Sequence, residues 1–215
     1  MESIKDIPPA EVEAVPAFAG FVPQAFLDDP VGYFEREGKN IKKGEKKVDD
    51  AGEVREDPDA VKDLPAWKNA DGKELLTVGK RINPSKGAVG ESDDPFYEYG
   101  ILRLLAQMNL PAAKPVAKAE QGDARLMVME RIPGIRWSER DSLKLKENGY
   151  SDEDVEGLTF QAERMMRELK DRFDAAGIVR TWKLQDMVLQ IDVERKRVTS
   201  VVPTDWERTR VEYKK

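Results

Sequence analysis

The chemistry open to this chain is limited by its residue types, because the sequence contains no histidine and no cysteine. Without imidazole or thiol groups it cannot form a serine triad, a cysteine nucleophile or a zinc site with histidine or cysteine ligands. Acid–base or metal chemistry must then depend on carboxylates, lysines or tyrosines. Carboxylates with lysines suit a phosphorylated ligand and Mg²⁺, which prefers oxygen ligands. A net charge of −6 argues against a general nucleic-acid binder, which needs a basic face.

Lys80 and Glu98 are one pair of candidate functional residues. Lys80 lies near the end of an apolar segment, residues 74–82, that predicts a strand, and Glu98 lies in the helix predicted to follow. A lysine that is held by a glutamate presents a fixed ammonium group to phosphate oxygens. The alternative is a solvated lysine beside Arg81 and an unrelated glutamate on the helix surface.

Asp205 is a further candidate. It follows an apolar segment, residues 198–202, that predicts a strand, and it belongs to the sequence Asp205-Trp206-Glu207. A carboxylate at the end of a strand can bind a Mg²⁺ ion that bridges the phosphates of ATP. The alternative is a surface aspartate that caps a last helical turn.

The elements that must position these residues begin with an irregular region. Prolines recur through residues 1–30 and predict an arm with at most short helical turns. Residues 32–54 are charged and contain glycines, which fits either short strands or a mobile basic loop. In the strand interpretation, Ile41, Val48 and Val54 point inward. Residues 57–70 are acidic and predict a loop or a short helix that Trp67 anchors.

The later segments give clearer signals. They predict a strand at residues 74–82, a helix from Asp94-Pro95 to about residue 108, a hairpin that turns at residues 121–123 into a strand, a partly helical segment at 137–149, a long helix from a capping box at Ser151–Asp154 to Gly177, and strands at 187–191 and 197–202. This order predicts an α+β fold with two lobes. The predicted divisions are an arm at residues 1–36, a β-rich lobe with one helix at 37–130, and a hinge with a second lobe at 131–215.

Residues 126–134 carry the resemblance to a known family. A short apolar run ends at Met129, the polar pair Glu130-Arg131 follows, and Pro133-Gly134 predicts a turn. The segment resembles the hinge of the protein-kinase-like fold, and residues 98–115 with 126–134 look most like aminoglycoside phosphotransferases and RIO-type kinases. This resemblance implies that the backbone from Glu130 to Ile132 binds the adenine edge of ATP and that Met129 limits the pocket behind it. The alternative for Met129 is a residue that only fills the core.

The same resemblance assigns roles to residues of the second lobe, and two alignments remain open. It implies that Lys80 and Glu98 orient the phosphates and that Asp205 binds the metal. Aligned from Gly177, Arg180 replaces the family's histidine and Trp182 replaces its catalytic aspartate. Aligned backward from Asp205, Asp186 falls within one residue of the catalytic aspartate and Gln190 lies near the metal-binding asparagine. Residues 38–44 precede Lys80 where a glycine-rich loop is expected, but they contain too few glycines to identify one.

Three hypotheses about function follow. The first is an ATP- and Mg²⁺-dependent phosphotransferase with a minimal two-lobed protein-kinase-like fold and a truncated C-lobe, which acts on a protein with Asp186 as its base. It is similar in extent to compact effector kinases that bacterial pathogens deliver into host cells. The second is a pseudokinase that binds nucleotide or a partner without catalysis, favoured by Arg180 and Trp182. The third is an interaction domain without nucleotide, with a basic stretch at residues 39–47.

The sequence also gives an expectation about location. No apolar run reaches the roughly 18 residues of a membrane span. The first residues lack the basic and apolar regions of a secretory signal. We therefore expect a cytoplasmic protein, or an effector that acts in the cytosol of a host. Substrate identity and oligomeric state are open.

Overall fold

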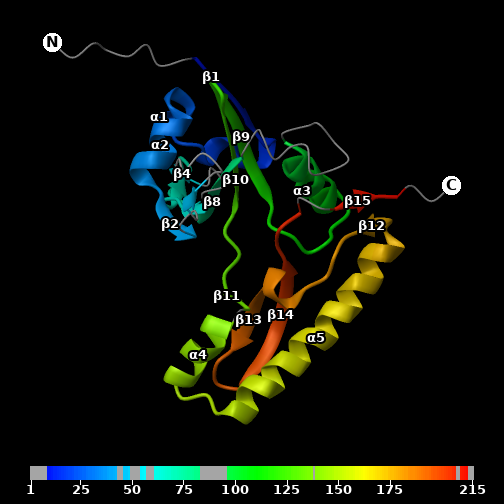
Figure 1. The fold of residues 1–215 in the computed structure, drawn as a ribbon. Coiled ribbons are helices and arrows are strands. Elements are labelled where there is room, and N and C mark those ends of the chain that lie inside the picture. The colour runs from blue at the N-terminus through cyan, green and yellow to red at the C-terminus, as the bar shows by residue number, and fades with distance from the viewer. Residues whose placement is uncertain are drawn as a thin grey trace. The chain divides into compact units, whose positions relative to one another are not determined.

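The computed structural model describes residues 9–42, 46–48, 54–56, 61–82, 96–137, 139–206 and 209–212, which form two compact units (Figure 1). The first unit comprises Met1–Arg103 with Lys114–Arg131, and the second comprises Leu104–Ala113 with Ile132–Lys215. Strands dominate the first unit, and the second combines helices with a strand hairpin. The predicted α+β class is therefore confirmed.

The first unit is built on a six-stranded antiparallel sheet with the strand order β1-β9-β10-β8-β5-β2. The strands are β1 (Ala10–Ala14), β2 (Lys39–Lys42), β5 (Val61–Asp63), β8 (Thr77–Ile82), β9 (Pro115–Gln121) and β10 (Ala124–Glu130). The predicted hairpin is confirmed, because β9 and β10 pair across a turn in which Gly122 adopts a left-handed φ of 57°. Lys80 lies on β8, inside this sheet.

Three parts of the sheet differ from the sequence prediction. The supposed irregular arm contains β1, which pairs with β9 along its whole length. The supposed loop or short helix at residues 57–70 contains β5, which lies between β8 and β2. Ile41 on β2 does not point inward, because 54% of its surface is exposed. In each case pairing with a strand distant in sequence fixed the structure, and local composition did not signal it.

Helices and short strands complete the first unit. They are η1 (Pro16–Phe21), α1 (Gln24–Asp28), α2 (Pro30–Glu37), the pair β3 (Lys46–Val48) and β4 (Val54–Glu56), the pair β6 (Trp67–Lys68) and β7 (Glu74–Leu75), and most of α3 (Tyr97–Gln107). Asp29 caps α2 by accepting a hydrogen bond from the Gly32 N–H. The predicted helix start at Asp94-Pro95, the directions of Val48 and Val54, and Gly44 lie outside what the structure describes.

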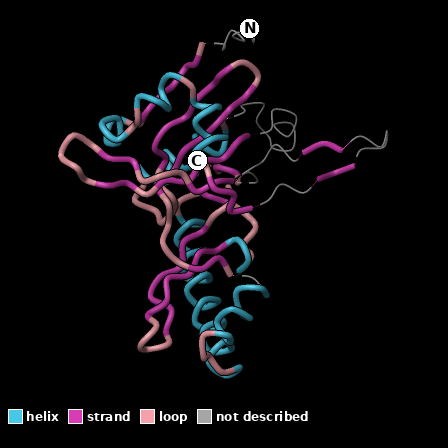
Figure 2. The backbone as a smooth tube through the Cα atoms, turned by 90° about the vertical axis from the view of Figure 1, so that its left-hand side faces the viewer, coloured by secondary structure: helices cyan, strands magenta, loops and turns pink. Residues whose placement is uncertain are grey.

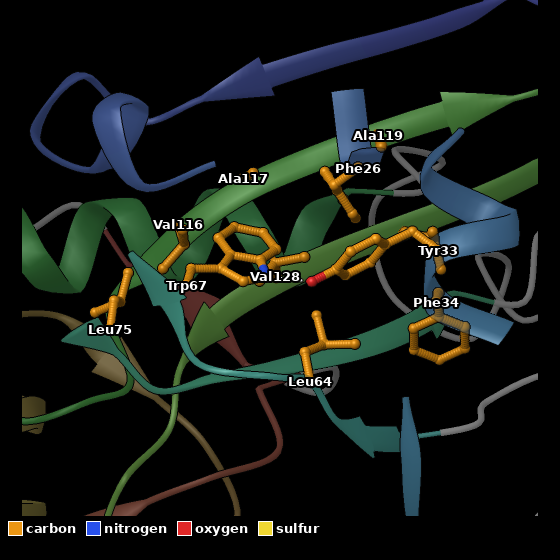
Figure 3. Packing of buried hydrophobic residues seen from close by; sticks show 11 residues of the cluster. Phe26, Tyr33, Phe34, Leu64, Trp67, Leu75, Val116, Ala117, Ala119 and Val128 are labelled. Carbon is orange, nitrogen blue, oxygen red and sulfur yellow. Dashed lines mark hydrogen bonds between the residues drawn. The ribbon is translucent and has the colours of Figure 1, made fainter. Parts of the chain in front are cut away.

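Aromatic side chains fill the core of the first unit on one face of the sheet (Figure 3). Trp67 is 1% exposed, and its ring centroid lies 5.2 Å from that of Phe26. Its indole N–H donates to the Tyr33 hydroxyl at 3.2 Å, so the polar end of the ring is also satisfied. The predicted anchoring role of Trp67 is confirmed, and it joins the β6–β7 pair to α1 and α2.

The second unit packs two helices with the β13–β14 hairpin, as the views at right angles in Figures 1 and 2 show. Its elements are β11 (Ile135–Arg136), α4 (Glu139–Glu147), α5 (Asp152–Ala175), β12 (Ile178–Val179), η3 (Leu184–Asp186), β13 (Met187–Asp192), β14 (Arg197–Pro203) and β15 (Arg210–Val211). β11 pairs with β13, and β15 pairs with β12. The long helix and both predicted strands are confirmed.

Helix α5 begins with the capping box that the sequence predicted. Ser151 Oγ accepts from the Asp154 N–H, and the Asp154 carboxylate accepts from the Ser151 N–H. Lys196 donates to the same carboxylate, and this bond, with the Ser151 N–H, lowers the pKa of Asp154 to about 2. The buried stripe comprises Val155, Leu158, Ala162, Leu169 and Phe173. Within the described ranges, no helix is long and apolar enough to cross a membrane.

Candidate functional site

The first unit contains the predicted ion pair between Lys80 and Glu98. Lys80 Nζ lies 2.6 Å from Glu98 Oε2, and the two side chains are 13% and 10% exposed. Glu98 shares one face of α3 with the buried Leu102 and Leu105, four and seven residues further on, so the helix holds its carboxylate at the sheet. A charged hydrogen bond of this length in a partly dehydrated place fixes the direction of the ammonium group.

Met127 is the side chain that lies beside Lys80 in the sheet. It is fully buried and faces Lys80 on β8 and Lys118 on β9, and residues that face each other across a ladder project to the same side. Met127 and the half-buried Met129 pack with Phe96 and Tyr99. Burial raises the pKa of Tyr99, whose phenol is protonated at neutral pH even at its ordinary pKa of 10.0.

The segment predicted to bind adenine leaves β10 with part of its backbone already bonded. The Glu130 N–H donates to the Lys114 carbonyl at 2.8 Å, and the Arg131 N–H donates to the Leu76 carbonyl at 2.9 Å. These two amide groups are therefore engaged within the first unit. A purine edge would need other backbone groups of the segment, such as the Glu130 carbonyl and the Ile132 N–H.

In the second unit, backbone bonds hold Asp186 and Asp205 on adjacent segments. Asp186 ends η3, directly before β13, and Asp205 follows the end of β14 by two residues. Thr204 joins them, because its N–H and its hydroxyl both donate to the Asp186 carbonyl at 2.8 Å. Asp205 is exposed and Asp186 is half-buried. The structure therefore brings these two predicted residues together at one end of the hairpin.

Gln190 does not lie at this end of the hairpin. It pairs with Ser200, whereas Met187 pairs with Pro203. At about 3.3 Å per residue along a strand, Gln190 lies roughly 10 Å beyond Met187. Its carbonyl accepts a hydrogen bond from the Thr199 hydroxyl at 3.1 Å. An ion that Asp205 binds is therefore distant from Gln190 in the hairpin ladder.

The loop between β12 and β13 contains features that the sequence did not reveal. Trp182 packs edge-on against Phe173 of α5 with ring centroids 5.3 Å apart, and Phe173 stacks on Trp206 at 5.5 Å. Arg180 donates to the Thr204 carbonyl at 2.9 Å. Asp186 is the one carboxylate between Arg180 and Met187 in the sequence. A carboxylate base in this loop would therefore be Asp186.

The donor set at this end of the hairpin fits Mg²⁺ in its chemistry. Asp186 and Asp205 offer carboxylate oxygens, and Mg²⁺ in nucleotide sites uses one or two carboxylates together with phosphate oxygens. Among the residues that the structure describes, no group of three or more histidine, cysteine or acidic side chains could hold a metal ion by itself. An ion here would use these carboxylates together with oxygens supplied by a ligand or by water.

Gly177, directly before β12, allows the backbone at Glu212 to pack closely against it. It adopts a left-handed φ of 75°, and a Cβ atom at this position would collide with the Glu212 carbonyl oxygen. The Glu212 N–H donates to the Gly177 carbonyl at 2.7 Å, beside the β12–β15 pair. A glycine is therefore required here for both the backbone conformation and the contact.

We expect Gly177→Ala to lower the melting temperature clearly more than Gly149→Ala. Both glycines have left-handed φ values, 75° and 89°, and both substitutions cost about 1–2 kcal/mol for the backbone alone. Nothing lies within 4 Å of a Cβ on Gly149, so that variant reports the backbone cost without a collision. Thermal unfolding of both variants measures the difference. Equal melting temperatures would show that the Gly177–Glu212 contact adds nothing.

Comparison with known proteins gives similarity of fold only. No protein-family model matches the sequence, and no curated protein matches it. One similar solved structure is WaaP in complex with acyl carrier protein, with a TM-score of 0.46 and 16% identity over 94% of this chain and 73% of that chain. Another is the Cydia pomonella granulovirus kinase PK-1, with a TM-score of 0.39 and 16% identity over 85% of this chain and 55% of that chain.

Proposed function

We propose that this chain is an ATP- and Mg²⁺-dependent phosphotransferase of the protein-kinase-like class. The observation that carries the proposal is the ion pair between Lys80 on β8 and Glu98 on α3, at 2.6 Å and nearly excluded from water. A fixed ammonium group is the feature that phosphoryl-transfer sites use to hold nucleotide phosphates. The predicted order of elements supports it, since a strand, a helix, a hairpin, a polar connector, a long helix and a strand pair follow each other here.

In this proposal the second unit supplies the carboxylates. Asp205 would hold Mg²⁺ together with phosphate oxygens, and the ion would neutralise charge on the transferred group. Asp186 would accept the proton of the acceptor hydroxyl as its oxygen bonds to the γ-phosphorus and the bond to ADP breaks. We take the acceptor to be a protein hydroxyl. The backbone of the hinge segment from Glu130 to Ile132 would bind the adenine edge. The resemblance of this segment supports a relation to aminoglycoside phosphotransferases and RIO-type kinases.

A second candidate is a pseudokinase that binds nucleotide without transferring phosphate. Trp182 favours this function, because its ring packs on Phe173 in the loop where a catalytic group is expected. In this case Lys80 and Asp205 would hold MgATP, and Asp186 would have a structural role through its two hydrogen bonds from Thr204. The two candidates differ only in whether a substrate hydroxyl loses its proton.

The test compares binding with transfer in the purified chain. MgATP should raise the melting temperature, because a ligand at a hundred times its dissociation constant adds about 2.7 kcal/mol of stability. Radiolabelled ATP should then transfer its γ-phosphate to a generic protein acceptor or to the chain itself. Stabilisation without transfer would favour the pseudokinase. If MgATP neither stabilises the chain nor donates its phosphate, the result would contradict a nucleotide function. The third hypothesis, an interaction domain without nucleotide, would then remain.

A further inference from the structure

Arg180, directly after β12, packs its guanidinium group against two indole rings. Its guanidinium carbon is 4.5 Å from the ring centroid of Trp206 and 5.2 Å from that of Trp182. Its Nη2 donates to the Thr204 carbonyl at 2.9 Å, and its Nε donates to the Thr181 carbonyl at 3.2 Å. A guanidinium group stays charged at all physiological pH values, and aromatic faces attract it.

The aromatic side of this contact is anchored on the long helix. Trp206 is 1% exposed and stacks on Phe173 of α5, which is fully buried, with an angle of 18° between the rings. Trp182 meets the same phenylalanine at 79°. Because α5 holds Phe173, it also sets the positions of both indoles and, through them, the plane of the guanidinium group.

Two of the residues that Arg180 contacts are the neighbours of Asp205 in the sequence. It bonds the carbonyl of Thr204, which belongs to the peptide group before Asp205, and it stacks on Trp206, which follows. Thr204 is held from its other side by two hydrogen bonds to the Asp186 carbonyl. Both flanks of Asp205 are therefore fixed by groups outside its own strand.

Asp205 itself has an unusual backbone conformation. Its φ is 62°, in the left-handed region, which is sterically unfavourable for a residue with a Cβ atom. Such a conformation persists only where the surroundings impose it. The contacts of Arg180 with Thr204 and Trp206 are the surroundings that can do so, because they fix the chain immediately before and after the strained residue.

We propose that Arg180 is a positioning residue that locks Asp205 in this conformation before any ligand binds, with its carboxylate preset for Mg²⁺. This role rests on the phosphotransferase function proposed above and deepens it. Arg180 touches neither nucleotide nor acceptor in this proposal. It acts through Thr204 and Trp206, so its loss should weaken the response to the metal more than the affinity for the nucleotide.

The first test is the magnesium dependence of ATP turnover in Arg180→Met. The variant keeps an unbranched side chain against the indoles but loses the donor to Thr204. A hydrogen bond from a charged group corresponds to about tenfold to hundredfold in an equilibrium constant. We expect the half-saturating Mg²⁺ concentration to rise by about that factor. The KM for ATP at saturating Mg²⁺ should change far less, and Arg180→Lys should give a smaller effect.

Arg136→Met is the matched control. Arg136 also donates to a backbone carbonyl of this loop, but the acceptor is Gln185 at 3.2 Å and not a neighbour of Asp205. Its magnesium dependence should equal that of the wild type. An equal rise in both variants would reduce Arg180 to a general stabiliser of the loop and overturn the role.

A second measurement requires neither activity nor a folded variant. Hydrogen exchange of the amide groups at residues 204–206 should be slow in the ligand-free wild type and should slow little more with MgATP. Fast exchange that becomes slow only with MgATP would overturn the lock. A wild type that does not use ATP would refute the proposed function alone, and the exchange rates would still decide whether the segment around Asp205 is held before a ligand binds.

Discussion

Asp186→Asn should lower phosphate transfer by about 10²–10⁴-fold while MgATP still stabilises the protein, because a positioned general base contributes about that much to a rate. Asparagine has nearly the same shape and keeps the backbone carbonyl that Thr204 bonds twice. The fold of the loop should therefore survive, and only the ability to accept a proton is lost. Initial rates with radiolabelled ATP, beside the MgATP-induced shift in melting temperature, measure the two effects separately.

Asp192→Asn is the control for a lost carboxylate in the same hairpin. Asp192 ends β13 and accepts from the Arg195 N–H at 3.1 Å, at the opposite end of the strand from Asp186. The Asp192→Asn variant should transfer phosphate at the wild-type rate. Full activity in Asp186→Asn would remove the base from the proposal. A loss of both transfer and MgATP stabilisation would instead place Asp186 among the metal ligands beside Asp205.

The elements that the sequence predicted well are those with local signals. Helix α5 has an apolar stripe and a capping box within its own residues, and the structure shows both. The β9–β10 hairpin needs only a glycine that adopts a left-handed φ between two apolar runs. The Lys80–Glu98 pair was predicted through the resemblance to the protein-kinase-like fold, and the strand and the helix that carry it are consecutive in the chain.

The elements that the sequence missed depend on partners far along the chain. Residues 10–14 alternate between half-buried and exposed positions, but the signal is short and prolines surround it. The strand forms because β9, more than a hundred residues later, offers an edge for pairing. The position of Gln190 has a more local origin, because the turn after Asp192 and a register irregularity next to Gln190 decide its place in the ladder.

The Arg180 contact could not have been predicted from sequence spacing. It requires the end of β12, the end of β14 and a residue of α5 to meet in three dimensions. The two alignments of the loop each used one end of it as a reference. In the structure Thr204, next to Asp205, is hydrogen-bonded to both Arg180 and Asp186. The residues after Gly177 and those before Asp205 therefore pack together.

Lys80→Met should reduce phosphate transfer by about 100- to 1000-fold, the usual effect of removing one group that stabilises developing charge. Methionine matches the length of the aliphatic stem, so packing beside Met127 is retained. The variant leaves Glu98 charged and 10% exposed without the ammonium group, which should destabilise the first unit by about 3 kcal/mol, near the lower end for a broken buried pair. Transfer rates and thermal unfolding measure the two effects.

Two further variants separate catalysis from stability. Lys118→Met removes a lysine that faces the same Met127 from the neighbouring strand and pairs with Glu13 at 3.0 Å, and it should keep wild-type transfer. The double variant Lys80→Met with Glu98→Gln removes the uncompensated charge, so it should regain most of the lost stability because both members of the pair are then neutral. It should stay as inactive as Lys80→Met. Recovery of transfer together with stability would show that the pair serves only the fold, and the proposal that Lys80 holds phosphate would then be wrong.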